Sequence, residues 1–391
     1  MRILFLHEVG YFEKPIFEMH EFPEHLAELG HEVAFVEYRE SVNFRNGDSF
    51  GFEATGRVVP DAKIYLYSQT AKLPGVAGRI VAALFFPVFF LRVLRRFRPD
   101  VVVSYSVPTS GWQALCICKA LRIPFVYRSL DVSHLIRKTW LQNLVLFSEK
   151  FVIRGAQLVS ANNLAMRDYV ISMGAEPVAV NVHLPPSDLT HFLEPPVAQN
   201  ELRVKLGIPS SARIYLYMGS FFYFSGLEFV IESFAAAEDD EFLVLVGGGD
   251  QDQELRKMAS LSPKSDQIVF TGSVPYADLP SYLGLASVTI NPMVRTLAAN
   301  AAIPNKIIQY MASGKLVVST ELEGVVRTFG CLKGVETVDD PRKVFLAARK
   351  MALKGTGSVH GKDNQKFVRE VFNLHDRLAD FEGALLSVAA R

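Results

Sequence analysis

The sequence predicts an α/β protein of two halves, each with a parallel sheet covered by helices on both faces. Short apolar runs alternate with helical patterns from Met1 to about Pro186, a proline-rich break follows at 184–197, and a second alternation runs from Ile214 to Ser319. Such alternation is typical of right-handed β-α-β units and doubly wound sheets. A chain of 391 residues is also too long for one hydrophobic core, which favours at least two domains.

In the first half, short apolar runs predict strands at Ile3–Leu6, Val33–Glu37, Val101–Tyr105, Phe125–Arg128 and Leu158–Ala161. Helical patterns lie between them, at Phe22–Leu29, Gly111–Leu121 and Leu135–Arg154. Strands without polar alternation are buried on both faces. We therefore expect a first doubly wound domain over residues 1–190, ending at a linker that includes Glu194-Pro-Pro-Val197.

The second half repeats the pattern. Its predicted strands are Ile214–Met218, Phe242–Val246, Ile268–Thr271, Val288–Asn291 and Leu316–Ser319. Its predicted helices are Leu227–Ala237, Gln251–Ser260, Ala277–Leu285 and Asn305–Ser313. We expect a second domain over residues 191–362 and a helix over 363–391 that crosses back to the first domain. Two halves of similar build imply a ligand cleft between them.

A continuous apolar run, Ile80–Leu91, is flanked by arginines at positions 79, 92, 95, 96 and 98. Twelve residues are too few to span a bilayer of about 30 Å as a helix. A helix with an aromatic apolar stretch and a basic end can lie in a membrane interface instead. A buried helix whose basic end complements its dipole explains the same pattern. The sequence therefore predicts peripheral membrane contact through 79–98 or an ordinary core helix.

Charge and cysteine content point to a cytoplasmic protein. Lys and Arg number 41 and so do Asp and Glu, so no global field favours nucleic acid. The three cysteines, Cys116, Cys118 and Cys331, form no C-x-x-C pair, which fits a reducing compartment. The N-terminus reaches His7 and Glu8 after a few apolar residues, so it reads as a first strand and no signal peptide is expected.

The segment from Ile303 to Ser319 predicts a helix that opens at Pro304 and leads, through Gly314, into a buried strand. A helix N-terminus offers unpaired N–H groups and a positive dipole end to an anion. Lys306 lies in this first turn, where a cation is unfavourable unless an anion is near. The alternative is a solvated lysine on an ordinary helix that covers the sheet.

Glycine-rich turns follow two predicted strands. Gly219 to Gly226 encloses the hydroxyls of Ser220 and Ser225, and Gly247 to Gly249 follows the next strand. Such turns can present N–H groups to phosphate oxygens, although a packed aromatic turn explains the first as well. Asp250 and Asp252 form a D-x-D that fits a helix cap better than a metal site, and no metal ligand set accompanies it.

Five segments occur in one fixed order: Gly219–Gly226, Leu245–Asp250, Val269–Pro275, Ala286–Pro292 and Pro304–Gly314. This succession resembles the C-terminal nucleotide-sugar domain of retaining GT-B glycosyltransferases of family 4. The first half resembles the same family through Leu29–Val33, Arg98–Val102 and Pro124–Asp131. The resemblance implies a GT-B fold, two Rossmann-like doubly wound domains that face a central cleft.

The resemblance also implies a set of donor-binding residues. A nucleotide-diphosphate sugar would be the co-substrate, with no cofactor and no metal. The nucleobase would lie on backbone groups near Gly272 and Val274. The diphosphate would lie against the Gly219 turn, with Gly248, and against the helix start at Asn305 and Lys306. Gln309 stands where the family typically has a carboxylate for the ribose hydroxyls.

Departures from the family pattern concern charge. Ser220 and Ser225 stand where the family usually has an arginine and a lysine, and Ala301 where it has a glutamate. Because a desolvated diphosphate requires cations or several hydrogen bonds, we expect Arg295 and Lys306 to replace them. The same departures favour an alternative, a catalytically weakened scaffold that partners an active transferase.

On the acceptor side, Asp131 and His134 follow a predicted strand end, where α/β folds place ligand-contacting groups. They would bind sugar hydroxyls or stabilise oxocarbenium charge, although Asp131 can equally cap the next helix. Gly10, between His7 and Lys14, would lie in the first strand-to-helix loop near the diphosphate. A sugar-nucleotide epimerase lacks a convincing carboxylate pair here, and an oxidoreductase lacks G-x-G-x-x-G.

The sequence thus predicts a metal-independent, retaining glycosyltransferase. It would move a sugar by front-face displacement to a glycan or lipid-linked acceptor at the cytosolic membrane face.

Overall fold

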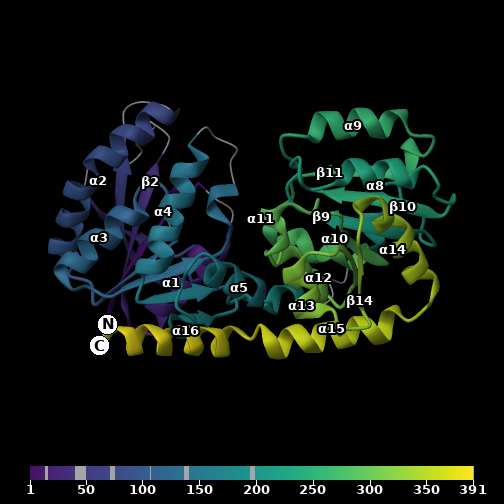
Figure 1. Ribbon diagram of the computed structural model, residues 1–391. Coiled ribbons are helices and arrows are strands. Elements are labelled where there is room, and N and C mark those ends of the chain that lie inside the picture. Colours follow the sequence, from purple (N-terminus) through teal and green to yellow (C-terminus); the bar gives the residue numbers. More distant parts are fainter. Residues whose placement is uncertain are drawn as a thin grey trace. The chain divides into compact units, whose positions relative to one another are not determined.

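The computed structural model describes residues 1–13, 16–39, 50–70, 75–105, 107–135, 141–193 and 199–390. The chain forms two compact units (Figure 1): unit 1 is Met1–Ser187 with Leu374–Arg391, and unit 2 is Asp188–Asn373. Each holds a sheet between helices, so the prediction of two Rossmann-like α/β domains is confirmed. The cleft between them stays a prediction. The expected Glu194–Val197 linker and Lys14 lie outside the described residues.

Unit 1 contains, among its described residues, an eight-stranded sheet in the order β3-β4-β2-β1-β5-β6-β7-β8. The strands are β1 (Arg2–Leu6), β2 (Glu32–Arg39), β3 (Phe52–Thr55), β4 (Lys63–Thr70), β5 (Val101–Ser104), β6 (Phe125–Ser129), β7 (Leu158–Ala161) and β8 (Val180–Val182). All neighbours pair in parallel except β3 with β4. The parallel strands at the centre are almost fully buried, as apolar runs predict.

The helices of unit 1 are α1 (Glu18–Glu28), α2 (Gly75–Phe97), α3 (Gly111–Leu121), α4 (Gln142–Gly155), α5 (Leu164–Ser172) and α16 (Leu374–Ala389). The predicted helix at 135–154 is shorter: a 3-10 turn covers Ser133–Leu135, and α4 begins at Gln142, with 136–140 outside the described residues. Leu378, Phe381 and Leu385 of α16 belong to the same buried cluster as β1 and α1.

Unit 2 contains a six-stranded, all-parallel sheet within the residues that are described, in the order β11-β10-β9-β12-β13-β14. The strands are β9 (Arg213–Met218), β10 (Glu241–Val246), β11 (Ile268–Gly272), β12 (Val288–Asn291), β13 (Leu316–Thr320) and β14 (Val335–Val338). The helices are α6 (Thr190–Leu193), α7 (Gln199–Lys205), α8 (Leu227–Phe234), α9 (Asp252–Leu261), α10 (Leu279–Leu285), α11 (Leu297–Asn300), α12 (Asn305–Ala312), α13 (Glu323–Phe329), α14 (Val344–Leu353) and α15 (Gly357–Val371).

Two sequence-based expectations about helices need correction. The apolar segment at 80–91 is part of a 23-residue helix, α2, so the argument that it is too short to span a membrane was wrong. In the part of the chain that is described, this helix alone is long and apolar enough to cross a bilayer. One side of it packs on β4 and α3. The helical stretch expected at 363–391 is two helices, α15 in unit 2 and α16 in unit 1.

The order of strands reverses at one place in each sheet. In unit 1, β2 pairs with one side of β1 and β5 with the other side. In unit 2, β10 pairs with one side of β9 and β12 with the other side. In doubly wound sheets, ligands bind outside the carboxyl ends of the strands at this point. The loops after β1, β5, β9 and β12 are therefore the candidate ligand-binding loops.

Candidate functional site

Two glycines allow the loops after β9 and β10 of unit 2 to approach each other. Gly219 and Gly247 have φ values of +138° and +135°, which side chains other than glycine rarely adopt. A Cβ on Gly247 would lie 2.0 Å from the carbonyl oxygen of Gly219, so alanine does not fit. The Gly219 N–H donates to Val246 O at 2.9 Å, and the Gly247 N–H donates to Gly272 O at 3.0 Å. Three strand ends are thus joined by backbone alone.

Lys306, in the first turn of α12, lies against this glycine turn. Its Nζ donates to Tyr217 Oη at 2.7 Å and would be 3.0 Å from a Cβ on Gly219. Tyr217 Oη in turn donates to the carbonyl of Ser220 at 2.9 Å. Burial lowers the pKa of Lys306 from its usual 10.5 to about 7, because a desolvated ammonium is disfavoured.

A tyrosine of α12 fixes the helix to the end of β9. The Met218 N–H donates to Tyr310 Oη at 2.8 Å, and this hydroxyl donates to Met218 O at 3.3 Å. Tyr310 is fully buried. The helix start that carries Lys306 is therefore held in register with the Gly219 turn. The sequence predicted that these two segments form one site, and the structure brings them together.

The two serines of the Gly219–Gly226 turn differ in environment. Ser220 is exposed, with its carbonyl held by Tyr217 as above. Ser225 is 2% exposed, and its hydroxyl donates to Phe222 O within the turn at 2.7 Å. The hydroxyl proton of Ser225 is therefore used to shape the turn, whereas the Ser220 side chain faces solvent.

The other donor-side residues predicted from the sequence lie on the same edge of the sheet. Arg295 follows β12, is half-exposed, and has a guanidinium nitrogen 3.9 Å from a carboxylate oxygen of Glu321. The adjacent Val294 N–H donates to Phe224 O at 2.9 Å, which ties the Arg295 loop to the glycine turn. Asn305 is exposed in the first turn of α12, and Gln309 is half-buried one turn later.

Three backbone positions complete this edge. The Gly248 carbonyl accepts from Phe221 N at 2.9 Å, next to the Gly219 turn. Gly272 ends β11 with a φ of +72°, and Val274 follows it, half-buried. Ala301, where the family has a glutamate, is buried after α11.

In unit 1, a buried glutamate organises the segment after β6 that carries Asp131 and His134. Glu149 of α4 is 0% exposed and accepts from the backbone N–H groups of Ser133 and His134, each at 3.1 Å. It also accepts from Tyr169 Oη at 2.8 Å and contacts His134 Nδ1 at 2.8 Å. The imidazole is thereby oriented through Nδ1. Sequence reasoning missed Glu149, because one acidic residue in a helix carries no signal.

Asp131 lies at the start of this segment and is reached by solvent. Desolvation by the surrounding protein and, second, the carboxylate of Glu18 raise the pKa of Asp131. Glu18 itself forms a buried bidentate pair with Arg128, with N–O distances of 2.5 and 2.8 Å. Arg128 also donates to His183 O at 2.7 Å, so the strand end before Asp131 is rigidly held.

Two further carboxylates fix the loops at the reversal point of unit 1. Glu8 accepts from the N–H groups of Thr109 and Ser110 at 2.7 and 2.8 Å, and so joins the loops after β1 and β5. Glu37 accepts from Tyr11 N at 2.6 Å, next to Gly10. A Cβ on Gly10 would lie 2.6 Å from the Glu13 side chain. The Gly10 loop is therefore compact and closely packed.

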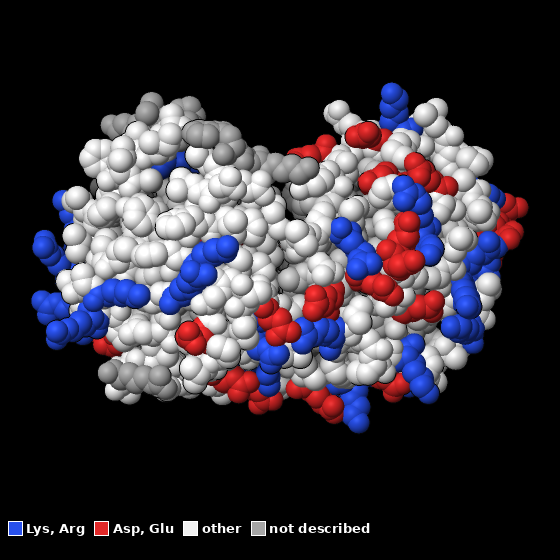
Figure 2. Space-filling model, in the orientation of Figure 1, with Lys and Arg blue, Asp and Glu red and all other residues white. Residues whose placement is uncertain are grey.

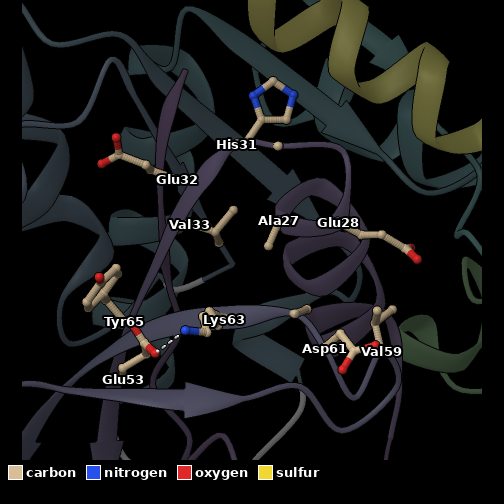
Figure 3. A pocket seen from close by; sticks show the side chains of 12 residues that line it. Ala27, Glu28, His31, Glu32, Val33, Glu53, Val59, Asp61, Lys63 and Tyr65 are labelled. Atoms are coloured by element: carbon tan, nitrogen blue, oxygen red, sulfur yellow. Dashed lines mark ion pairs between the residues drawn. The ribbon is translucent and has the colours of Figure 1, made fainter.

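A cavity of about 480 Å³ lies elsewhere on unit 1. Figure 3 shows it near the amino ends of β2 and β4, with Lys63 paired to Glu53 at 3.2 Å and with His31, Glu32 and Tyr65 at its wall. Parallel α/β sheets bind ligands at the carboxyl edge instead. None of the residues predicted to bind donor or acceptor lines this cavity. In the described ranges, no group of three or more His, Cys, Asp or Glu residues could hold a metal ion.

Comparison with known proteins agrees with this fold. Residues 212–349 match the model of the glycosyl transferases group 1 family, and residues 19–185 match a glycosyl transferase 4-like domain. The chain is 25% identical over 354 residues to a putative colanic acid biosynthesis glycosyl transferase of Escherichia coli, which covers 83% of this chain and 84% of that protein. It is 22% identical over 219 residues to the alpha-monoglucosyldiacylglycerol synthase of Streptococcus pneumoniae, covering 51% and 48% of the two chains.

Solved structures share the fold over the whole chain. Sucrose-phosphate synthase from Thermosynechococcus elongatus superposes with a TM-score of 0.81 at 18% identity, covering 100% of this chain and 99% of that one. Anabaena HepE in complex with UDP gives a TM-score of 0.75 at 16% identity, covering 99% and 100%. Together, the two family matches and the paired Rossmann-like units show that this chain belongs to the group 1 glycosyltransferases of the GT-B fold.

Proposed function

We propose that this protein is a retaining, metal-independent glycosyltransferase that moves a sugar from a nucleotide-diphosphate sugar to a glycan or lipid-linked acceptor. The observation that carries the proposal is the position of Lys306. This residue lies in the first turn of α12, and its Nζ lies against the Gly219 turn. A half-buried lysine at a helix start beside glycine backbone is suited to binding an anion.

The related proteins support the donor and acceptor classes. Crystal structures of Anabaena HepE hold UDP, and one holds UDP-glucose. The Escherichia coli relative is named for colanic acid biosynthesis and the pneumococcal relative for a glycolipid. We infer a sugar nucleotide as donor and an acceptor from cell-surface polysaccharide or glycolipid synthesis. Peripheral membrane contact through 79–98 belongs to the same proposal.

The donor's diphosphate would be neutralised by fewer cations than is usual in the family. Ser220 would offer the diphosphate a solvent-facing hydroxyl, whereas the Ser225 hydroxyl bonds within the turn. The positive charge that neutralises the diphosphate would therefore come from Lys306 and Arg295. Arg295 is paired only at 3.9 Å to Glu321, a distance that allows its guanidinium to turn to a phosphate. Gln309 would hydrogen-bond a ribose hydroxyl as a neutral group.

The reaction requires no nucleophile from the protein. The bond between the sugar C1 and the diphosphate oxygen breaks, and the acceptor oxygen forms a new bond to C1 on the same face. The acceptor's proton passes to the departing diphosphate, whose charge is stabilised by Lys306 and the helix start. On the acceptor side, Asp131 or the Glu149-oriented His134 would contact the sugar and stabilise positive charge at C1.

Calorimetric titration with UDP, GDP and ADP tests the donor site directly. One nucleotide is expected to bind, and Lys306→Ala or Arg295→Ala should weaken it by about 1.5–3 kcal/mol, the value of a charge-assisted hydrogen bond. Lys333→Ala is a matched control, because Lys333 is exposed just before β14, at the amino edge of the same sheet. Binding unchanged by excess EDTA and product of retained anomeric configuration by NMR would support the finer claims.

Absence of binding by all three nucleotides would favour the alternative, a scaffold that partners an active transferase. The inward-turned Ser225 hydroxyl and the alanine at position 301 are the features that favour it. Hydrolysis of a sugar nucleotide by the purified protein without acceptor would exclude the scaffold.

A further inference from the structure

Helices α2, α3 and α4 lie side by side on one face of the unit 1 sheet (Figure 1). Their inner sides are buried, with Phe86 and Phe90 of α2 fully enclosed. Their outer sides are also apolar, which the core does not require. The exposed apolar residues include Ile80, Leu84, Phe85 and Val88 on α2, Trp112 on α3, and Leu144, Phe147 and Phe151 on α4. We call this set the three-helix face.

Exposure on this face is high for large apolar side chains. Leu84 is 72% exposed and Phe147 is 68% exposed. Single exposed apolar residues are ordinary, but contiguous ones from neighbouring elements mark an interaction surface. These residues come from three adjacent helices, so they form one surface and not scattered sites.

The charges of the same helices have one sign. Their basic residues are Arg79, Arg92, Arg95, Arg96, Lys119, Lys150 and Arg154. Glu149 is the one acidic residue in the three segments, and it is 0% exposed and bonded within unit 1. The whole chain is balanced at 41 basic and 41 acidic residues, so this is a local asymmetry.

Figure 2 shows uncharged atoms over most of the part of the surface that carries α2, α3 and α4, with Lys and Arg below them. Most of the basic residues lie toward the carboxyl ends of the helices, beyond the apolar stretch: Arg92, Arg95 and Arg96 on α2 and Lys119 on α3, whereas Arg79 lies near the amino end of α2. Aromatic and aliphatic residues bordered by Lys and Arg are the composition of segments that lie in a membrane interface. Lipids with anionic headgroups attract such cations.

We propose that the three-helix face docks this protein on an anionic lipid bilayer. The apolar side chains enter the headgroup region and the basic margin contacts anionic lipid. This goes beyond membrane contact by the 79–98 segment alone, because one side of α2 packs on β4 and α3, and because α3 and α4 add exposed apolar residues of their own. The inference concerns unit 1 and does not depend on donor binding by unit 2.

Sedimentation with vesicles tests the proposal on the full chain. The protein should co-sediment with vesicles of phosphatidylcholine and phosphatidylglycerol in equal parts, and much less with phosphatidylcholine alone. Raising the salt should weaken binding, because exposed charges are screened. The double variant Leu84→Ser/Phe147→Ser should bind at least about tenfold more weakly. Arg95→Glu and Lys119→Glu should each cost at least about fivefold.

Matched controls come from α9 of unit 2. Leu261 and Lys257 are exposed there, so Leu261→Ser and Lys257→Glu should bind vesicles as the wild type does. UDP titration of every variant shows whether unit 2 is intact. A protein that binds UDP but no vesicles would refute the docking proposal alone, whereas one that binds vesicles but no nucleotide would refute the donor proposal alone.

Trp112 provides a second, independent measurement. The chain has two tryptophans, and Trp140, which lies outside the described residues, can be replaced in Trp140→Phe. The remaining fluorescence should shift to the blue with anionic vesicles and be quenched by brominated acyl chains. Unshifted emission with bound vesicles would overturn the assignment of this face. The assignment would also be wrong if the protein does not bind vesicles and instead forms a concentration-dependent dimer that Leu84→Ser/Phe147→Ser abolishes.

Discussion

The low pKa of Lys306 should make nucleotide binding strongly dependent on pH. Burial lowers this pKa to about 7 in the empty site, whereas a neighbouring diphosphate would raise it. The binding-competent, charged lysine is then half of the population at about pH 7 and about 3% at about pH 8.5. Because apparent affinity scales with the competent fraction, the dissociation constant should rise by up to about 16-fold over this range.

The sign of the stability effect follows from the same pKa. The folded-state pKa lies below the usual 10.5, so the unfolded chain binds the proton more tightly. Between about pH 10.5 and pH 7, each unit of decreasing pH should cost the folded wild type about 1.4 kcal/mol relative to Lys306→Met, and below pH 7 the cost should be constant. Lys306→Met should therefore be more stable at neutral pH and gain nothing near pH 10.5.

Two measurements check this reasoning. Calorimetry across pH should show a steep loss of affinity in the wild type and little slope in Lys306→Met, while Lys306→Arg keeps its charge at every pH and should also lose the slope. Urea unfolding of the wild type and Lys306→Met at several pH values gives the stability difference. Parallel loss of affinity in wild type and Lys306→Met would show that another group titrates, and the argument would fail.

Four further substitutions test the packing within the two units. Tyr217→Phe removes the hydroxyl that links the lysine to the turn and should weaken UDP binding about threefold to tenfold by calorimetry. Gly247→Ala places a Cβ 2.0 Å from a backbone oxygen at a positive φ, so it should destabilise the folded protein by more than about 3 kcal/mol. Gly383→Ala is the control: the position has open space in α16, so this change should stabilise the protein by about 0.5–1 kcal/mol in urea unfolding. Glu18→Gln leaves Arg128 buried without its carboxylate and should cost about 3–5 kcal/mol in the same assay; a loss below about 1 kcal/mol would contradict the view that this pair is fully desolvated.

The sequence was sufficient for the positions of the central strands, because uninterrupted apolar runs such as Val101–Ser104 are buried on both faces. The sequence was insufficient for the strands at the edges of the sheets. β4 alternates Ile64 and Leu66, both buried, with Tyr65, which is exposed, and a period-2 pattern as short as this one predicts a strand only weakly. The C-terminal helices were read as one because Phe372-Asn373, between α15 and α16, contains no proline or glycine to mark the break.

The site was predictable where it depends on backbone. Gly219, Gly247 and the start of α12 occupy positions that strand and helix periodicity already place at one edge of the sheet. Tyr217 was not predictable, because a tyrosine in a buried strand reads as core. Its role depends on a contact with Lys306, 89 residues later, and no local pattern encodes such a pair.

The two units hold their loops in different ways, and this difference bears on specificity. In unit 2, glycines let backbone approach backbone around Gly219, so backbone N–H and C=O groups contribute to the surface offered to a ligand. Such a surface suits a diphosphate and nucleoside common to many donors. In unit 1, the buried carboxylates of Glu8, Glu37 and Glu149 hold loop N–H groups at 2.6–3.1 Å. Loops fixed from beneath can change their outward side chains without losing their conformation, so acceptor choice should reside in unit 1.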